Sequence, residues 1–253
     1  MGQIKFSKAR FMRAFNFAGN AVEFIGKMPV FKAKNEDFFK NWSPEMTYVL
    51  GFFAADGNMI KNKRGAHFIA FYSTDRDILE KIKFCLGSDH KIYIRKKNLQ
   101  NKNWKKAYQI QIGSKEIFKD LLRLGFMPNK SLILKMPKIP RALAPHFLRG
   151  YFDGDGHVSA SEYQKKDRKH KSKIIITGLT SGSKKFLKGL WGVLKKYAVV
   201  KGGTLFYAQG HRLCFSSNDS FGLYNFMYKD AGKLYLSRKK VIFEHYFKNL
   251  LRA

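Results

Sequence analysis

The sequence predicts an α+β fold made of two pseudo-symmetric halves, with an apolar helix from each half packed against the other at the centre. Two observations lead to this prediction. Similar apolar segments a hundred residues apart, Tyr48 to Gly57 and Phe147 to Gly156, both end in an acidic turn. After each of them, patterns typical of strands and helices follow in the same order, which favours an internal duplication over two chance matches.

In the first half, the residue patterns predict strands and helices downstream of the apolar helix. Strand-favouring residues and alternation indicate strands, whereas apolar residues at helical spacing indicate helices, the last of which Gly125 should end. The predicted elements are a strand at His67 to Ser73, a helix at Ile78 to Leu86, a strand pair at Lys91 to Lys97 and Ala107 to Ile112, and a helix at Ile117 to Leu124.

The second half repeats this order. The predicted elements are a strand at Lys173 to Thr180, a helix at Phe186 to Tyr197, a hairpin of Thr204 to Gln209 with Arg212 to Ser216, and helices at Phe221 to Tyr228 and Arg238 to Leu251. Four prolines between Pro128 and Pro145 predict a linker, because proline interrupts helices and central strands. We therefore expect an N-terminal extension at 1–43, a first half at 44–136, a linker at 137–145 and a second half at 146–253.

Composition restricts the class of protein. The chain has 253 residues, 45% of them apolar, which suffices for a sizeable core. Two cysteines far apart, Cys85 and Cys214, indicate neither a disulfide framework nor a cysteine-based zinc site. No apolar run approaches the roughly 18 residues of a membrane span, and the first residues are too charged for a signal peptide. We expect a cytoplasmic protein, or an organellar one if it is encoded there, that is not secreted and has no membrane partner.

The charge indicates the partner. With 49 Lys and Arg against 18 Asp and Glu, the formal net charge is +31, and the basic residues are spread along the chain. The folded body should therefore be positive and suited to a nucleic acid. The alternative is that the many lysines reflect only coding bias and a solvated surface. In that case the repulsion among so many positive charges would oppose folding with no compensating function.

Small residues explain how the two apolar helices could meet. Gly51 and Ala55 share one helix face, as do Gly150 and Gly154, because residues four apart lie above one another. A glycine inside a helix costs about 1 kcal/mol relative to alanine, and close approach of another backbone would justify it. If the two small faces meet, Asp56 and Asp155 become neighbours at the ends of parallel helices.

Two neighbouring carboxylates repel each other unless they are protonated or bridged by a cation, and a hard divalent cation takes oxygen ligands from both. The alternative reading of each Asp-Gly pair is a plain helix end, with Gly57 or Gly156 in the left-handed conformation. Aspartate is unfavourable near the negative C-terminus of a helix. Its presence in both halves therefore favours a functional role.

These residues resemble the two nine-residue motifs of the single-chain LAGLIDADG homing endonucleases, here Val49 to Gly57 and Leu148 to Gly156. The resemblance covers about residues 44 to 251. It implies αββαββα halves that form a DNA-binding saddle of antiparallel sheets, with the motif helices at the centre. It also implies that Asp56 and Asp155 bind the catalytic Mg²⁺ or Mn²⁺, with backbone carbonyls of Ala55 and Gly154 as further ligands.

The resemblance assigns a basic residue near each scissile phosphate. By position these are Lys130 and Lys239, whose cations would activate water or stabilise the charge of the transition state; the alternative is that they are solvated surface lysines. Two positions depart from the apolar pattern of the motifs. An acidic residue occupies the earlier motif position only in the second copy, as Asp153. Arg149 is unusual in an apolar helix, and we expect it at a helix edge or in solvent.

Alternation along the predicted strands indicates which residues would face DNA. Ile92, Ile94, Ile110 and Ile112 are expected to face the core. The expected DNA-facing residues are Tyr93, Arg95, Lys97, Gln109 and Gln111 in the first half, and Lys173, Thr177 and Arg212 in the second. Arginine and glutamine can read guanine and adenine with paired hydrogen bonds, whereas most other lysines would contact phosphate.

The leading hypothesis is a monomeric, site-specific endonuclease that hydrolyses both strands of a long asymmetric DNA target with a divalent metal. Its gene is expected to be intron-encoded, with an intein-derived or a free-standing origin as the alternatives. An alternative on the same scaffold is a non-cleaving binder, either an RNA-splicing maturase that binds intron RNA or a regulator. A basic ribosome-associated protein would also explain the charge, but it leaves the duplicated acidic helices unexplained.

Overall fold

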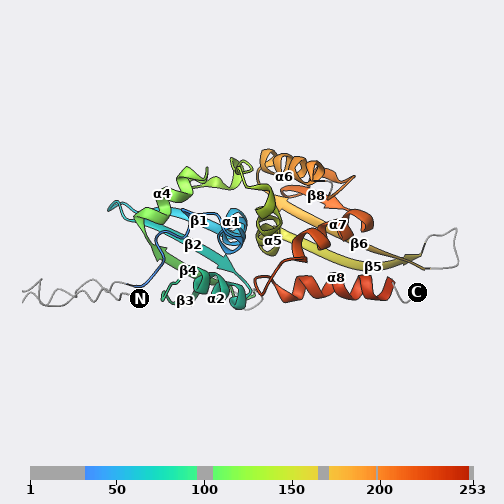
Figure 1. Ribbon diagram of the computed structural model, residues 1–253, viewed down its shortest axis with the longest axis horizontal. Helices are drawn as coiled ribbons and strands as arrows, with labels where there is room; N and C mark the ends of the chain where they lie inside the picture. Colours follow the sequence, from blue (N-terminus) through green and yellow to red (C-terminus); the bar gives the residue numbers. More distant parts are fainter. Residues whose placement is uncertain (1–31, 96–104, 165–170, 198, 251–253) are drawn as a thin grey trace, which may run out of the picture. The chain divides into compact units, whose positions relative to one another are not determined.

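A computed structural model describes residues 32–95, 105–164, 171–197 and 199–250. Within Lys32–Ala253, two halves each contain a four-stranded antiparallel sheet with helices packed on it, and helices α1 and α5 lie between the two sheets (Figure 1). The expected α+β fold of two similar halves is therefore confirmed. None of the helices in the described ranges is both long and apolar enough to cross a membrane.

The first half consists of α1 (Pro44–Asp56), β1 (Gly57–Lys61), β2 (His67–Ser73), α2 (Arg76–Cys85), β3 (Ile92–Ile94), β4 (Tyr108–Gly113) and α4 (Lys115–Arg123). The strands are ordered β1-β2-β4-β3, with antiparallel pairing throughout. The patterns predicted every one of these elements except β1, which continues directly from the end of α1. Gly125 follows α4 with φ of +88°, so it ends this helix as expected.

The second half consists of α5 (Ala144–Asp155), β5 (Gly156–Gln164), β6 (Lys171–Ser181), α6 (Lys184–Lys196), β7 (Thr204–Tyr207), β8 (His211–Phe215), α7 (Ser217–Tyr228) and α8 (Ser237–Leu250). Its sheet has the matching order β5-β6-β8-β7. Between the halves lie two short 3₁₀ turns, η2 (Lys130–Leu132) and η3 (Arg141–Leu143). The one element that the patterns missed here, β5, is the counterpart of β1.

Local sequence signals define where the helices begin. The Ser43 side chain accepts a hydrogen bond from the backbone N–H of Met46 at 3.0 Å, and Pro44 occupies the first turn of α1. Ser114 caps α4 and Ser183 caps α6 in the same manner. In the sheets, alternate residues such as Ile110 and Ile112 are fully buried, as predicted, and contribute to the core with the apolar faces of the helices.

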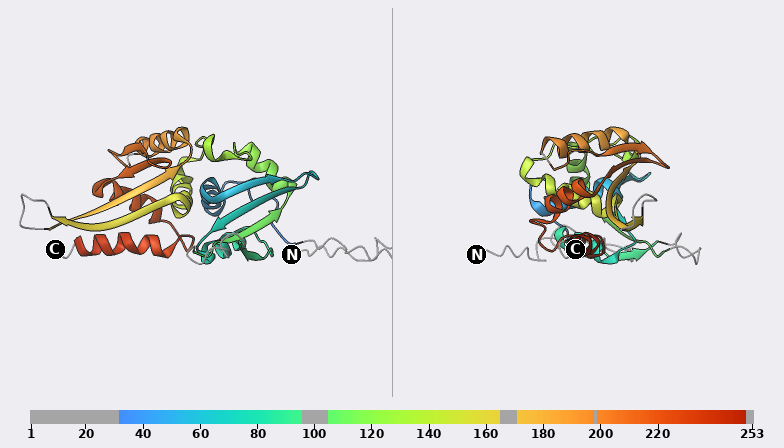
Figure 2. Two further views of the ribbon diagram at one scale, coloured as in Figure 1. Left: turned by 180° about the vertical axis from the view of Figure 1, so that it is seen from behind. Right: turned by 90° about the vertical axis from the view of Figure 1, so that its right-hand side faces the viewer.

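Helices α1 and α5 pack against each other along their length, and the view from behind shows them side by side (Figure 2). A Cβ atom added at Gly51 would overlap the carbonyl oxygen of Phe147, and one added at Gly150 would overlap that of Tyr48. The two backbones therefore touch where both side chains are absent, as the small faces predicted. This contact brings the C-terminal ends of the two helices to the same place.

Candidate metal and nucleic-acid site

Asp56 and Asp155 are the last residues of α1 and α5. A Cβ atom added at Gly154 would overlap that of Ala55 and lie 3.1 Å from Oδ2 of Asp56, so the second motif lies directly beside the first carboxylate. The two helix ends thus meet at their acidic residues, as expected from the small faces of the helices.

The plain helix-end reading of the Asp-Gly pairs is wrong in its geometry. Gly57 has φ of −93° and Gly156 has φ of −90°, which is extended backbone and not the left-handed conformation. Glycine is required there for space, because an added Cβ would overlap the ring of Phe53 or Phe152 four residues earlier. The chain can therefore leave each helix straight into β1 or β5, which keeps both carboxylates at the helix interface.

Burial and proximity disturb both carboxyl groups. The pKa of Asp56 is raised to about 7, first because burial disfavours its charge and second because the negative charge of Asp155 is close. The pKa of Asp155 is raised as well, again by burial. The positive charges of Lys130 and Lys239 act in the opposite direction on both groups. The site is therefore a pair of desolvated carboxylates with two cations nearby.

Lys130 and Lys239 are both only 5% exposed, which contradicts the alternative that they are solvated surface residues. Burial lowers the pKa of each to about 8, although the nearby aspartates favour the charged form. Their positions are similar in the two halves: the Lys130 ammonium lies 5.5 Å from the ring centre of Phe53, and that of Lys239 lies 5.1 Å from the ring centre of Phe152. The chain thus supplies one buried cation to each helix end.

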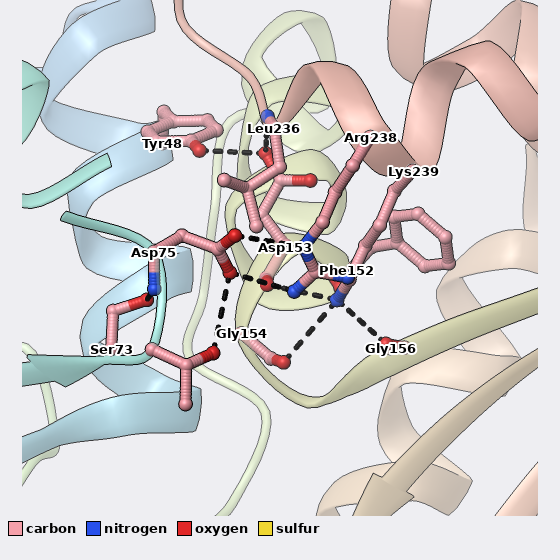
Figure 3. Close-up of polar contacts among 11 residues, drawn as sticks. Tyr48, Ser73, Asp75, Phe152, Asp153, Gly154, Gly156, Leu236, Arg238 and Lys239 are labelled. Carbon is pink, nitrogen blue, oxygen red and sulfur yellow. Dashed lines mark hydrogen bonds and ion pairs between the residues drawn. The ribbon is translucent and has the colours of Figure 1, made fainter. Parts of the chain in front are cut away.

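The two lysines differ in their hydrogen bonds. Nζ of Lys239 lies within hydrogen-bonding distance of four carbonyl oxygens around the end of α5 (Figure 3), those of Phe152 at 2.6 Å, Asp153 at 2.8 Å, Gly154 at 3.3 Å and Gly156 at 2.6 Å. Across the described part of the chain, Nζ of Lys130 has no hydrogen bond. Lys239, which belongs to α8, therefore caps the negative C-terminal end of α5. The ammonium of Lys130 is instead stabilised by the Phe53 ring and the two aspartates.

Arg149 is only 2% exposed, so the expectation of a side chain at a helix edge or in solvent is wrong. Its guanidinium donates to the carbonyl oxygens of Leu234 at 2.9 Å and Met227 at 2.7 Å, contacts His146, and lies over the ring of Tyr48. The helix interface and the α7–α8 connection cover it from both sides. The sequence could not reveal these acceptors, since they come from residues some 80 positions away.

Asp153 is equally buried. Its Oδ2 accepts from the hydroxyl of Tyr48 at 2.6 Å and from the backbone N–H of Leu236 at 3.0 Å, whereas Oδ1 is buried without a hydrogen-bond partner. Burial raises the pKa of Asp153 to about 6, opposed mainly by the Tyr48 hydrogen bond. The carboxylate of Asp153 is therefore a buried structural group that links α5 to Tyr48 of α1 and to Leu236 before α8.

In the first sheet, the structure places most of the expected DNA-facing residues at the surface. Tyr93 is 52% exposed, Gln111 is exposed and Gln109 half-buried, and the guanidinium of Arg95 stacks over the Tyr72 ring at 4.7 Å. Lys97 lies outside the described residues. The expectation that Ile94 faces the core is wrong, because it is 41% exposed at the end of the short edge strand β3.

In the second sheet, Arg212 is half-buried and Lys173 is exposed, but Lys173 lies on the same face of β6 as Thr177 and lines a cleft with Ile242 of α8. The assignments of Lys173 and Thr177 to the DNA face are therefore wrong. Thr177 is 1% exposed, and its hydroxyl is buried without a partner. It lies in the core with Ile175 and Leu179, the alternate residues of β6. Alternation failed here because both faces of β6 carry isoleucine, so the pattern could not show which face is inside.

The ion pair between Arg238 and Asp75 was not predicted from the sequence. Arg238, next to Lys239 on α8, makes two hydrogen bonds to Asp75 of the first half, at 2.8 and 2.7 Å (Figure 3). This pairing lowers the pKa of Asp75. A cleft of about 210 Å³ lies beside it, with lining residues that include Asp56, Thr74 and Gly154. No pattern marked Asp75, since it follows an ordinary strand end.

The donor set suits a hard divalent cation. A shared charge of +2 would stabilise two carboxylates that repel each other and are poorly solvated. The carbonyl of Gly154, a further expected ligand, already accepts from Lys239 at 3.3 Å, while Ala55 packs against Gly154. Within the described residues, no group of three or more His, Cys, Asp or Glu side chains is placed to hold a metal, so any cation would rest on the two aspartates.

Comparison with known proteins agrees with this geometry. A model of the LAGLIDADG-like domain matches residues 43–124 and 144–202, which include both motif helices. The chain belongs to the LAGLIDADG family. The two matched segments of this LAGLIDADG protein fall in its two halves, in agreement with the duplication seen in the fold.

Solved LAGLIDADG structures share the fold. The meganuclease I-AabMI bound to uncleaved DNA has a TM-score of 0.58 and 16% identity, covering 83% of this chain and 92% of that one. I-SmaMI bound to uncleavable DNA has a TM-score of 0.56 and 14% identity, covering 83% and 90%. The homing endonuclease I-WcaI, bound to its DNA recognition sequence, has a TM-score of 0.51 and 19% identity, covering 81% and 90%.

Curated relatives match over shorter stretches. The uncharacterized protein MJ0398 of Methanocaldococcus jannaschii is 27% identical over 168 residues, which span 63% of this chain and 52% of that protein. A component of the A-type ATP synthase of Methanopyrus kandleri is 30% identical over 114 residues, which span 45% of this chain and 10% of that protein. The chain thus covers about half the length of one relative and a tenth of the other.

Proposed function

We propose that this LAGLIDADG protein is a site-specific, double-strand DNA endonuclease of the homing type that depends on a divalent metal. The observation that carries the proposal is the pair of desolvated carboxylates, Asp56 and Asp155, at adjoining helix ends in a chain with a formal charge of +31.

In this proposal, Asp56 and Asp155 hold Mg²⁺ or Mn²⁺ beside the scissile phosphates. The bound cation would polarise the phosphoryl oxygens and assist the attacking and leaving oxygens. Lys130 and Lys239 act from the flanks, where a buried cation aimed at developing negative charge stabilises the transition state. The pKa of Lys130, lowered to about 8 in a side chain without a hydrogen bond to any described residue, also allows it to exchange a proton near neutral pH.

The DNA would lie across the two sheets. Arg95, Gln109 and Gln111 of the first sheet and Arg212 of the second are suited to reading bases, and exposed lysines to holding phosphate. Because the two halves differ in these residues, one monomer would recognise a long target without symmetry. I-WcaI, which shares the fold, is bound to its recognition sequence, and I-SmaMI has been captured with uncleaved DNA in the presence of calcium ions.

The first experiment is selection of cleaved sequences from a randomised duplex library, with Mg²⁺, with Mn²⁺ and with EDTA. The selected duplex then serves as substrate for the purified Asp56→Asn variant. We expect this variant to lose double-strand cleavage while binding the duplex with nearly unchanged affinity. If the wild type binds DNA but does not cleave it, the protein is a non-cleaving regulator or a maturase. Binding to intron RNA would then distinguish the maturase from the regulator. Unchanged cleavage by Asp56→Asn would remove Asp56 from the proposed site.

A further inference from the structure

The beginning of α8 is held in place by the buried carboxylate of Asp153. Oδ2 of Asp153 accepts from the backbone N–H of Leu236 at 3.0 Å. The carbonyl of Leu236 in turn accepts from the N–H groups of Lys239 and Lys240 at 3.1 and 3.3 Å, so Leu236 sits at the first turn of the helix. Figure 3 shows Asp153 between Tyr48 and Leu236, with Lys239 on the helix that follows. A bond that fixes Leu236 therefore fixes the turn from which Lys239 projects.

Arg149 supplies a second anchor for the same segment. Its guanidinium donates to the carbonyl oxygen of Met227, near the end of α7, and to that of Leu234, in the connection between α7 and α8. The positive charge of Arg149 also acts on the carboxylate of Asp153. Since a buried charge is tolerated only when it is paired and hydrogen-bonded, the two residues form one unit that ties the connection to α5.

Lys239 completes the arrangement, because its ammonium returns to α5 and donates to the carbonyl oxygens of Phe152, Asp153 and Gly156. Backbone and side chain of the 236–239 turn are thus both attached to the end of the motif helix. A shift of Leu236 would pull Lys239 away from these carbonyls.

The first half lacks this device. Ala54 and Leu50 occupy the positions that correspond to Asp153 and Arg149, and neither side chain can form an ion pair or a hydrogen bond. The segment around Lys130 is held differently, since the hydroxyl of Ser183 in the second half donates to the carbonyl of Leu134 at 2.7 Å. The two lysines therefore have unlike supports, although their aromatic neighbours correspond.

We propose that Asp153 is a positioning residue for Lys239, and that it supports cleavage of only one of the two DNA strands, the one whose phosphate lies beside Lys239. This inference rests on the proposed nuclease function. It predicts that loss of the Asp153–Leu236 bond slows one nicking step, because misplacing a catalytic group by about 1 Å can cost on the order of 100-fold in rate, and leaves the step beside Lys130 near its wild-type rate.

The test is a strand-specific nicking assay on the selected duplex, with a different label on each strand. Asp153→Ala introduces the alanine that the first half has at the corresponding position, Ala54. In this variant, DNA nicked in one strand should accumulate in place of double-strand breaks. Asp153→Asn keeps an oxygen that accepts from Leu236 and should restore most of the slowed step. Tyr48→Phe, which matches Phe147 of the second half, removes the other bond to Asp153 but keeps that to Leu236, so it should nick both strands evenly. Equal slowing of both strands by Asp153→Ala would overturn the proposal.

A second measurement does not depend on cleavage. Acetic anhydride labelling of the folded protein without DNA, read by mass spectrometry, gives the reactivity of Lys239 relative to Lys130 in the same molecule. In Asp153→Ala this ratio should rise several-fold, and in Asp153→Asn and Tyr48→Phe it should remain near wild type. An unchanged ratio in Asp153→Ala would refute the positioning role even if the wild type cleaves DNA. A raised ratio in Asp153→Ala, together with a wild type that cleaves no DNA, would refute the nuclease function and leave the positioning role standing.

Discussion

Gly51 and Gly150 face each other across the centre of the molecule, each with its Cα against the backbone of the opposite helix, at Phe147 and Tyr48 respectively. This contact determines how closely α1 and α5 approach. It also determines that their acidic ends, Asp56 and Asp155, lie together.

Gly150→Ala should destabilise the protein by roughly 1–3 kcal/mol or more, because its new methyl group would overlap backbone that cannot rotate away. Gly192→Ala in α6 is the matched control. Its methyl group would meet nothing within 4 Å, so the substitution should stabilise the helix by up to about 1 kcal/mol. Urea unfolding of both variants checks the prediction, and equal stability of the two would contradict the close contact.

Asp56→Asn should be more stable than the wild type at pH 8 without divalent metal. With a pKa of about 7 in the folded state against the ordinary 3.8, the folded protein holds this proton more tightly than the unfolded chain does. The corresponding stability is present below about pH 4 and is lost as the pH rises to about 7, by up to about 4 kcal/mol in all. The asparagine variant has no such loss.

Urea unfolding at pH 4, 6 and 8 measures this difference, which should be small at pH 4 and greatest at pH 8. Addition of Mg²⁺ at pH 8 should then stabilise the wild type and leave Asp56→Asn nearly unaffected. A difference between the two proteins that does not change with pH would contradict the raised pKa of Asp56.

Lys239→Met should cost more stability than Lys130→Met. The first substitution removes a donor from the carbonyl oxygens of Asp153 and Gly156 at the end of α5, and a buried acceptor that loses its donor costs roughly 1–3 kcal/mol. The second removes an ammonium that has no hydrogen bond within the described ranges and that contacts an aromatic ring near the two aspartates. Because Asp56 can take up a proton in its place, we expect a loss under about 1 kcal/mol. Thermal unfolding of both variants at pH 7 compares them, and the reverse order would contradict the hydrogen bonding of Lys239.

Thr177→Val should leave DNA affinity unchanged and should not lower stability. The residue is buried and its hydroxyl lacks a partner, so a methyl group of similar size removes an unmet polar group, worth up to about 1–3 kcal/mol. Arg212→Ala, on the opposite face of the same sheet, should weaken binding and reduce its salt dependence. Titration of labelled duplex at two salt concentrations measures the affinity of each variant and its salt dependence. Weakened binding by Thr177→Val would indicate that this residue contacts DNA after all.

The failures of sequence reasoning share a cause. Arg149 was expected at a helix edge or in solvent, and Thr177 on the DNA face, because composition and alternation describe one strand or helix at a time. What buried them lies elsewhere in the chain: Leu234 and Met227 accept from Arg149, and the core behind β6 surrounds Thr177. The same holds for the Asp75–Arg238 pair, whose partners are 163 positions apart.

The sequence by itself determined the duplication, the type and order of nearly all helices and strands, and the meeting of Asp56 with Asp155. These follow from periodicity and from paired small residues, which are local properties of the chain. Only the tertiary structure decided that Lys130 and Lys239 are buried, that Lys239 binds the end of α5, and that Asp153 and Arg149 hold the turn before it. Solvation and hydrogen-bond partners depend on what the rest of the chain brings into contact, and no local pattern records that.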